Sequence, residues 1–242
     1  MIGISRDGDV VTIELQRPER RNALNEQMLD LLRDGVEDAA DDGARAIVLT
    51  GQGSVFCAGA DLSVVYSETF ADKLLDMLHT VDSVPVPVIA AVNGAALGAG
   101  TQLAIASDLR VAAPDASFGI PAAKLGITVD RWTVHRLSSL VGSGPARSML
   151  LGVELLGATD AHAHGLANKI GTLADAQEWA KTIAGLAPLT LAHLKLAFND
   201  DGTQDEESHE LRAALYRAWQ SEDAKEGRLA RKEKRPPHFT GK

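Results

Sequence analysis

The stretch PVIAAVNGAALGAGTQLAIASDLRVAA, residues 87–113, decides the fold class. Its first six residues form an apolar run of strand length, and Asn93-Gly94 predicts a turn after it. The glycines at 98 and 100 open a predicted helix that runs to Ala106, and DLRVAA then returns to a strand pattern. A strand, a helix and a second strand in succession predict an α/β fold.

The same alternation continues on both sides of this stretch. Apolar runs and helical spacing predict strands at 2–5, 10–15 and 44–50, and helices at 25–40, 68–80, 131–140, 146–151, 160–164 and 174–186. Beyond residue 187 only helices are predicted, at 189–198, 205–219 and 223–234. The sequence therefore predicts a core over residues 1–187 and a helical C-terminal region over residues 188–242.

Residues 83–107 contain no charged side chain, a length that would allow a membrane span. Two prolines, three glycines and several polar residues interrupt this run, so we expect two elements around a tight turn and no integral membrane segment. The N-terminus shows no secretory signal pattern, and the single cysteine, Cys57, excludes an internal disulfide. Both observations favour a cytoplasmic protein.

Charge and composition exclude a general nucleic-acid binder. The 242 residues contain 24 Lys and Arg against 33 Asp and Glu, a net charge of −9, and ten aromatic residues. Binding to phosphates needs a basic surface, and binding to single strands needs aromatic stacking. Residues 225–242 are the exception, because seven basic and two acidic residues lie there. This end is a candidate for contact with an anionic group.

Three segments carry a family resemblance: RPERRNALN at 17–25, IVLTGQGSVFCAGADL at 47–62, and PVIAAVNGAALGAGTQLAIASDLRVAAPDASFGIP at 87–121. In this order they resemble the crotonase superfamily, the enoyl-CoA hydratase/isomerase proteins. The resemblance implies a spiral of ββα units with a helical C-terminal trimerisation region, and a homotrimer or a hexamer made of two trimers. It also implies an acyl-CoA ligand from fatty-acid or lipid metabolism, with no separate cofactor.

The resemblance assigns the oxyanion hole to the backbone N–H groups of Ala60, in CAGAD, and Ala99, in LGAG. Chemistry next to a thioester develops negative charge on the carbonyl oxygen, and fixed N–H donors stabilise that charge. Small residues let a ligand approach the backbone closely, and the helix predicted to start at this point favours negative charge at its N-terminus. The residue types therefore suit the assigned role.

Typical hydratases of the family use two glutamates, and the matching positions here are Gln102 in GAGTQL and Ala122 in FGIPA. Glutamine orients water by hydrogen bonds but cannot accept and return a proton, and alanine has no functional group. We therefore expect the thioester site to be kept, with Gln102 and Ala122 beside the acyl group. Hydratase activity should be weak or absent, as in an acyl-CoA carrier.

Asp130, in GITVDRW, matches a position where some relatives have a catalytic aspartate. It is also a favourable N-cap for the helix that begins at Arg131. Two alternative functions stay open: an isomerase, hydratase or thioester-processing enzyme that uses Asp130, and an orthodox hydratase despite both substitutions. Trp132 is expected in the pocket wall or the core.

Coenzyme A is anionic, so cations are needed near its phosphates. Candidates are Arg20 and Arg21 before the NAL motif, and Lys234 and Arg235 in the basic tail, which would reach a neighbouring subunit. The alternative for each is a solvated basic face. No metal site is predicted, because His162 and His164 are two residues apart and do not share a helix face.

Overall fold

A computed structural model of the chain describes residues 1–200 and 209–242. Its main sheet has six strands in the order β1-β2-β3-β5-β7-β10. β1 pairs antiparallel with β2, and the other neighbours are parallel. The strands are β1 (Ile2–Asp7), β2 (Val10–Leu15), β3 (Ala46–Gly51), β5 (Val88–Val92), β7 (Leu109–Ala112) and β10 (Lys169–Ile170). The strands predicted at 10–15, 44–50 and 87–92 are thus confirmed to within two residues.

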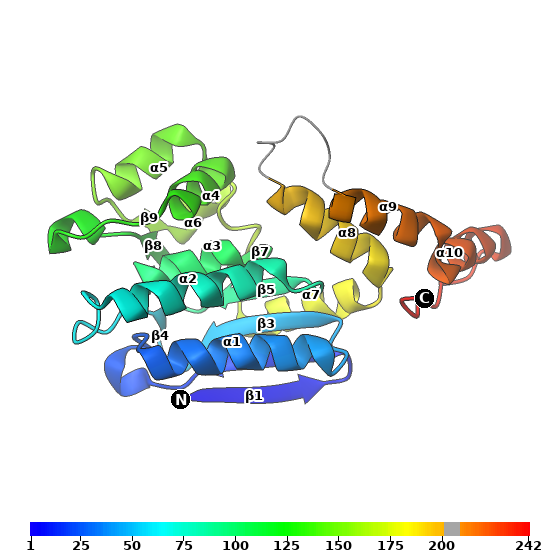
Figure 1. Cartoon of the computed structure of the whole chain (residues 1–242), viewed down its shortest axis with the longest axis horizontal. Helices are drawn as coiled ribbons and strands as arrows, with labels where there is room; N and C mark the ends of the chain where they lie inside the picture. Colours follow the sequence, from blue (N-terminus) through cyan, green and yellow to red (C-terminus); the bar gives the residue numbers. More distant parts are fainter. Residues whose placement is uncertain (201–208) are drawn as a thin grey trace.

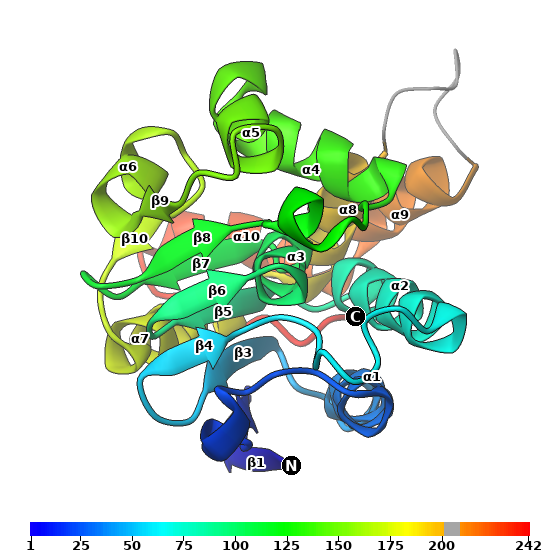
Figure 2. The ribbon, with the colours of Figure 1, turned by 90° about the vertical axis from the view of Figure 1, so that its left-hand side faces the viewer.

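A second sheet has four short strands in the order β4-β6-β8-β9. They are β4 (Val55–Cys57), β6 (Ala95–Leu97), β8 (Ser117–Gly119) and β9 (Leu156–Gly157). In Figure 2, β4, β6 and β8 follow the same order as β3, β5 and β7 of the main sheet. The first unit, β1-β2-α1, has both strands in the main sheet, and each of the next three passes adds one strand to each sheet and then a helix. This is the expected spiral of ββα units.

Side chains of the main sheet alternate between two helical layers, because successive residues of a strand point to opposite faces. Ile47 and Leu49 of β3 join the larger core with α1 (Glu26–Asp41), α2 (Glu68–Ser83) and α3 (Ala99–Ala106). Val48, between them, packs on the other face with α7 (Leu173–Ala184). Asn25 caps α1 by accepting a hydrogen bond from the Met28 N–H at 3.0 Å, as its side chain and position predict.

The remaining helices lie at the edges of this core or form the C-terminal region. They are α4 (Arg131–Val141), α5 (Ser143–Leu150), α6 (Ala158–Ala163), α8 (Pro188–Asn199), α9 (His209–Gln220) and α10 (Glu222–Glu233), with short 3-10 helices η1 (Pro18–Arg20) and η2 (Ala122–Leu125). Figure 1 shows α9 and α10 extending from one side, away from both sheets. The helix predicted at 205–219 begins outside the described residues. Within residues 1–200 and 209–242, no helix has the length and apolar character that a bilayer span requires.

Lys195, a buried lysine of α8, links this helix to the core by an ion pair and hydrogen bonds. The Lys195 ammonium is 2.9 Å from the Asp108 carboxylate, and it also donates to the carbonyls of Val81 and Val86 at 3.0 and 3.2 Å. Asp108 accepts a further hydrogen bond from the Val88 N–H at 2.7 Å. A buried charge needs such partners to offset its lost hydration, so this network fixes where the C-terminal helices leave the core.

Candidate functional site

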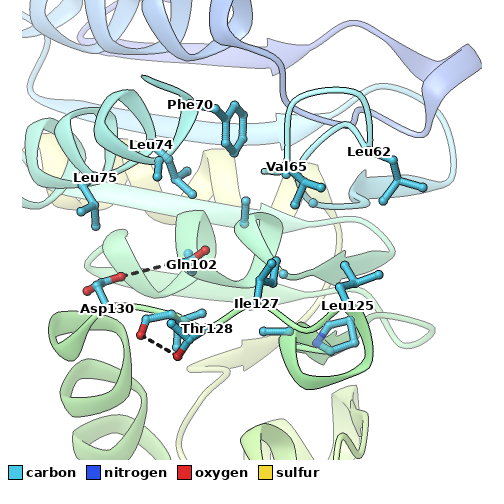
Figure 3. A pocket seen from close by; sticks show the side chains of 18 of the residues that line it. Leu62, Val65, Phe70, Leu74, Leu75, Gln102, Leu125, Ile127, Thr128 and Asp130 are labelled. Carbon is cyan, nitrogen blue, oxygen red and sulfur yellow. Dashed lines mark hydrogen bonds between the residues drawn. The ribbon is translucent and has the colours of Figure 1, made fainter. Parts of the chain in front are cut away.

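A cavity of about 240 Å³ lies between the start of α2, the start of α3 and the segment that leads into α4 (Figure 3). Its lining is mostly apolar and comprises Ala58, Gly59, Ala60, Leu62, Val65, Phe70, Ala71, Leu74, Leu75, Gly98, Ala99, Gln102, Pro121, Ala122, Leu125, Ile127, Thr128, Val129 and Asp130. An apolar cavity with a few polar groups is typical of a small-molecule site. Five of the residues selected from the sequence meet here: Ala60, Ala99, Gln102, Ala122 and Asp130.

The first backbone turn of the site contains Gly59 and Ala60. The carbonyl of Gly59 accepts a hydrogen bond from the Leu24 N–H at 2.8 Å, and the N–H of Asp61 donates to the Leu24 carbonyl at 2.7 Å. The N–H of Ala60, between these two bonds, has no hydrogen-bond partner among the described residues. Gly59 has a φ of +100°, a left-handed conformation that favours glycine. This turn therefore presents one free donor.

The second turn opens α3. Its N-cap Gly98 donates to the Gly119 carbonyl at 2.8 Å, and the Thr101 hydroxyl donates to the Ala96 carbonyl at 2.6 Å. Ala99 is the first helical residue, and within the described part of the chain its N–H has no partner, as expected for the first turn of a helix. The helix dipole adds partial positive charge at the same end.

The two turns touch each other. A Cβ placed on Gly59 would lie 2.8 Å from the Leu97 carbonyl oxygen and 3.7 Å from the Ala99 nitrogen. Gly59 and Gly98 therefore let two backbone segments approach that larger residues would separate. Both unpartnered N–H groups consequently lie at one end of the same cavity.

Asn22 and Arg17 support the first turn, and neither is among the site residues predicted from the sequence. Asn22 is fully buried and accepts from the Arg17 N–H at 3.0 Å, while its amide nitrogen donates to the carbonyls of Gln52 and Val55 at 2.9 and 2.7 Å. The Arg17 guanidinium forms an ion pair with Asp61 at 2.8 Å. Hydrogen bonds from the Ser63 N–H and hydroxyl, and then from Arg17, lower the pKa of Asp61.

Polar groups of α3 and α4 meet at the other side of the cavity. The Gln102 amide nitrogen donates to the Thr133 hydroxyl oxygen at 2.8 Å and approaches an Asp130 carboxylate oxygen at 3.4 Å. Asp130 caps α4 by accepting from the Thr133 N–H at 2.9 Å, and it also accepts from the Thr133 hydroxyl at 2.7 Å. Asp130 thus serves as a helix cap and lines the cavity at once, so both interpretations of its role agree with its position.

Trp132 does not line this cavity. Its ring makes an edge contact with His79, with the ring centroids 6.1 Å apart, and it packs against the larger core. Ala122, at the start of η2, does line the cavity and brings only a methyl group to it.

The four cations selected for coenzyme A lie in two places. Arg20 and Arg21 are exposed at η1, next to the first turn, and the Arg21 carbonyl accepts from the Ala58 N–H at 3.0 Å. Lys234 and Arg235 directly follow α10 in the sequence. Figure 1 shows α10 at the side of the molecule that lies away from both sheets. Glu226 contacts Arg235 at 2.6 and 2.9 Å, and this contact lowers the pKa of Glu226 to about 2.

Neither Cys57 nor the histidine pair adds reactive chemistry to the site. Cys57 is fully buried on β4, and burial raises the pKa of its thiol to about 12, which disfavours a reactive thiolate. The imidazole of His162 lies 2.9 Å from the Ala167 carbonyl. In the part of the chain that the structure describes, no three His, Cys, Asp or Glu side chains gather as a metal site.

Known proteins resemble this chain over its whole length. The family model described as enoyl-CoA hydratase/isomerase matches residues 5–242. Proteins named probable enoyl-CoA hydratase echA6 from Mycobacterium tuberculosis (strain CDC 1551 / Oshkosh) and Mycobacterium leprae (strain TN) are 53% and 52% identical, with 100% of each chain covered. A crystal structure of an enoyl-CoA hydratase from Polaromonas sp. JS666 has a TM-score of 0.90 at 29% identity and covers 99% of both chains. The chain belongs to the enoyl-CoA hydratase/isomerase family.

Proposed function

We propose that the cavity binds an acyl-CoA thioester and that the protein has weak or no hydratase activity. One observation carries the proposal: two unpartnered backbone N–H groups, of Ala60 and Ala99, lie at one end of an apolar cavity. The thioester carbonyl oxygen would accept both donors while the acyl chain follows the apolar wall. Each such donor stabilises a developing oxyanion by about 3–4 kcal/mol.

The other polar groups of the cavity do not suit hydration. Adding water to an enoyl thioester requires one group to remove a proton and another to return it. Gln102 cannot do either, and Ala122 offers a methyl group. Among the described residues of the lining, Asp130 is the one titratable side chain, and its carboxylate already accepts hydrogen bonds from the N–H and the hydroxyl of Thr133. Because each positioned acid or base contributes about 10²–10⁴-fold, hydration should be at least about 10⁴-fold slower than in a two-glutamate enzyme.

The surface cations support the coenzyme A part of the ligand. Arg20 and Arg21 are exposed beside the first turn, and among the described residues their side chains form no ion pair. They are therefore free to meet phosphates against the protein's overall net charge of −9. Lys234 and Arg235 would add to this site only from a neighbouring subunit of a trimer or hexamer.

The test measures binding and hydration in parallel on the purified protein. Calorimetric titration should show saturable binding of saturated and 2-enoyl acyl-CoAs, while loss of enoyl absorbance should stay near the uncatalysed rate. Hydration at a rate typical of the family would overturn the carrier part of the proposal. Absence of any acyl-CoA binding would overturn all of it.

Replacing Ala99 tests the donor pair directly. Proline is tolerated at the first position of a helix and removes the N–H, so Ala99→Pro should weaken acyl-CoA binding at least about tenfold. Ser143→Pro is the matched control, because Ser143 also begins an eight-residue helix after a glycine of positive φ and lies outside the cavity lining. Unchanged affinity in a folded Ala99→Pro variant, checked by thermal unfolding, would exclude Ala99 as a donor.

A second candidate function rests on Asp130, whose carboxylate lines the cavity. In that case the protein is an enoyl-CoA isomerase, a hydratase or a thioester-processing enzyme in which Asp130 moves the proton or attacks the thioester. Asp130→Asn keeps the helix cap but removes the base, since asparagine is an equally good N-cap. Any turnover found for the wild type should then be lost, and turnover that survives would exclude this role.

A further inference from the structure

Arg110, on β7, is a fully buried arginine that forms no ion pair within the part of the chain that the structure describes. Its guanidinium donates to four backbone carbonyls, those of Leu166 at 2.5 Å, Ser107 at 2.7 Å, and Ala104 and Asp108 at 3.2 Å each. Burial lowers the pKa of Arg110 to about 10, so the group keeps its charge at neutral pH. A charge in the interior needs compensation for its lost hydration, and the carbonyl dipoles supply it here.

The carbonyls at the C-terminal end of α3 meet two guanidinium groups. The last carbonyls of a helix have no partner within the helix and carry its negative partial charge. Here the Ala104 carbonyl accepts from Arg110, and the Ile105 carbonyl accepts from the Nε of Arg136 at 3.0 Å. Every residue of α3 is buried, so these cations take the place that water has at the end of an exposed helix.

The contacts at this end of α3 leave one positive charge without an opposite charge. Lys195 pairs with Asp108 at 2.9 Å, and Arg136 pairs with Asp82 at 3.5 Å. The charges of these two pairs cancel at a distance. The charge of Arg110 therefore remains, directly behind the helix whose other end opens into the cavity.

We propose that Arg110 strengthens the donor at the N-terminus of α3, and that it is a positioning residue for the thioester carbonyl although it lies outside the cavity. This inference rests on the proposed binding of an acyl-CoA. A cation at the C-terminal end stabilises the aligned peptide dipoles and adds to the positive potential at Ala99. Ala104 follows Ala99 by five residues, so the guanidinium lies about 12 Å from an oxygen bound at the helix start. At an effective dielectric constant of about 20, its charge should change the affinity for a partly negative oxygen by about threefold.

Two ligands that differ only at the carbonyl isolate this effect: an acyl-CoA and the S-alkyl-CoA thioether of the same chain length. The ratio of their affinities, from calorimetric titration at pH 8, measures what the carbonyl oxygen contributes. Arg110→Met should lower this ratio about threefold, whereas Arg110→Lys keeps the charge and should retain most of it. Arg45→Met is the matched control and should leave the ratio unchanged. Arg45 also donates to carbonyls, those of Phe239 and Leu186 at 2.7 and 2.8 Å, and lies outside the cavity lining.

A second variant changes the charge behind α3 in the opposite direction. Asp82→Asn removes the carboxylate that pairs with Arg136 and should raise the ratio by about twofold. The Oδ1 atom of Asp82 is buried and accepts no hydrogen bond from the described residues, so asparagine costs none at this atom. A role of these residues in packing alone would weaken the binding of both ligands alike and leave the ratio unchanged. This variant decides the question if Arg110→Met does not fold.

Infrared difference spectra of an acyl-CoA isotope-labelled at its carbonyl carbon give a readout that stability does not move. Stronger polarisation lowers the stretching frequency of the bound carbonyl. The band should therefore shift to higher frequency in Arg110→Met and to lower frequency in Asp82→Asn. A ratio that a folded Arg110→Met leaves unchanged, or that Asp82→Asn does not raise, would overturn the inference but leave the proposed acyl-CoA binding intact. If no acyl-CoA binds to the wild type, both fail.

Discussion

The donor end of the cavity and the segment that follows its first turn are built in different ways. At the donor end, the turns around Ala60 and Ala99 are joined by backbone hydrogen bonds to Leu24, in the loop before α1, and to β8. In the segment that follows, residues 62–66, Leu62 lines the cavity; Leu62 and Tyr66 are each 71% exposed, and one hydrogen bond of 3.1 Å joins the Tyr66 hydroxyl to the Leu125 carbonyl. The donor end therefore belongs to the core, while residues 62–66 form a loosely attached cover.

This difference separates two tasks of a thioester site. The carbonyl oxygen needs donors at fixed distances, and fixed distances come from backbone packed in a core. An apolar chain needs only area, which exposed leucines on a less constrained segment can supply. We therefore expect substitutions at the donor end to change stability and binding together, and substitutions in the cover to change binding alone.

The largest effect is expected at Gly100, where α3 passes the end of β4. A Cβ at Gly100 would overlap the Cys57 carbonyl oxygen and lie 2.9 Å from the Cys57 side chain, so the helix start would have to move. Gly100→Ala should lower the free energy of unfolding by about 3 kcal/mol and abolish acyl-CoA binding. Urea denaturation and calorimetric titration measure the two effects.

Gly144→Ala is the control for this change. Gly144 lies in the first turn of α5, is exposed, and has no atom within 4 Å of an added Cβ. The substitution should leave stability unchanged or raise it by about 0.5 kcal/mol. Equal destabilisation by both alanines would contradict the role given to the contact with Cys57.

A smaller loss is expected for Asn22→Ala. The variant leaves the Arg17 N–H and the carbonyls of Gln52 and Val55 without their partner, and it puts alanine at a φ of +56°. Destabilisation of about 2 kcal/mol should follow, together with weaker binding, because Asn22 holds the segment that supports Ala60. Asn25→Ala, which removes one cap hydrogen bond from α1, should cost about 1 kcal/mol. A loss for Asn22→Ala no larger than that of Asn25→Ala would contradict this ranking.

The sequence predicted the elements with long periodic patterns and missed the short ones. The helix predicted at 68–80 extends over Glu68–Ser83, and the one predicted at 131–140 extends over Arg131–Val141. β4, β6 and β8 have three residues each, and β6 consists of Ala95, Ala96 and Leu97. Three residues are too few to show alternation, and the alanines of β6 have weak strand propensity. Their pairing depends on the neighbouring strands of the sheet, which the local sequence does not describe.

The residues of the candidate site were likewise predicted only where the local sequence carries a motif. Ala60 and Ala99 were assigned through the family resemblance of the motifs CAGAD and LGAG, and the small residues of these motifs suit the assigned role. Asn22 and Thr133 had no such signal, since their partners are distant in the sequence: Val55 is 33 residues from Asn22, and Gln102 is 31 residues from Thr133. A left-handed asparagine in RRNAL was the one available clue, because asparagine tolerates that conformation.

Acid should weaken the donor end through Asp61. Its pKa is lowered in the folded protein by the hydrogen bonds of Ser63 and the ion pair with Arg17, so its ionised form stabilises the fold above the ordinary aspartate pKa of about 4. This contribution is lost as pH falls through the folded pKa. The free energy of unfolding, from urea denaturation at pH 7 and pH 3, should therefore change less in Asp61→Asn than in the wild type, by up to about 1 kcal/mol. An identical pH dependence in both proteins would show that the ion pair adds nothing to the turn.

The smallest effect is expected in the cover, at Leu62. Because its side chain is already 71% exposed, Leu62→Ala should change the free energy of unfolding by less than about 0.5 kcal/mol. A bound acyl chain would bury part of this leucine, so its loss should weaken acyl-CoA binding about threefold. Leu151→Ala is the matched control, at 73% exposure and outside the cavity lining, and should change neither quantity. A loss of stability in Leu62→Ala as large as that of Asn22→Ala would mean that the cover is part of the core, and the contrast between the donor end and the cover would disappear.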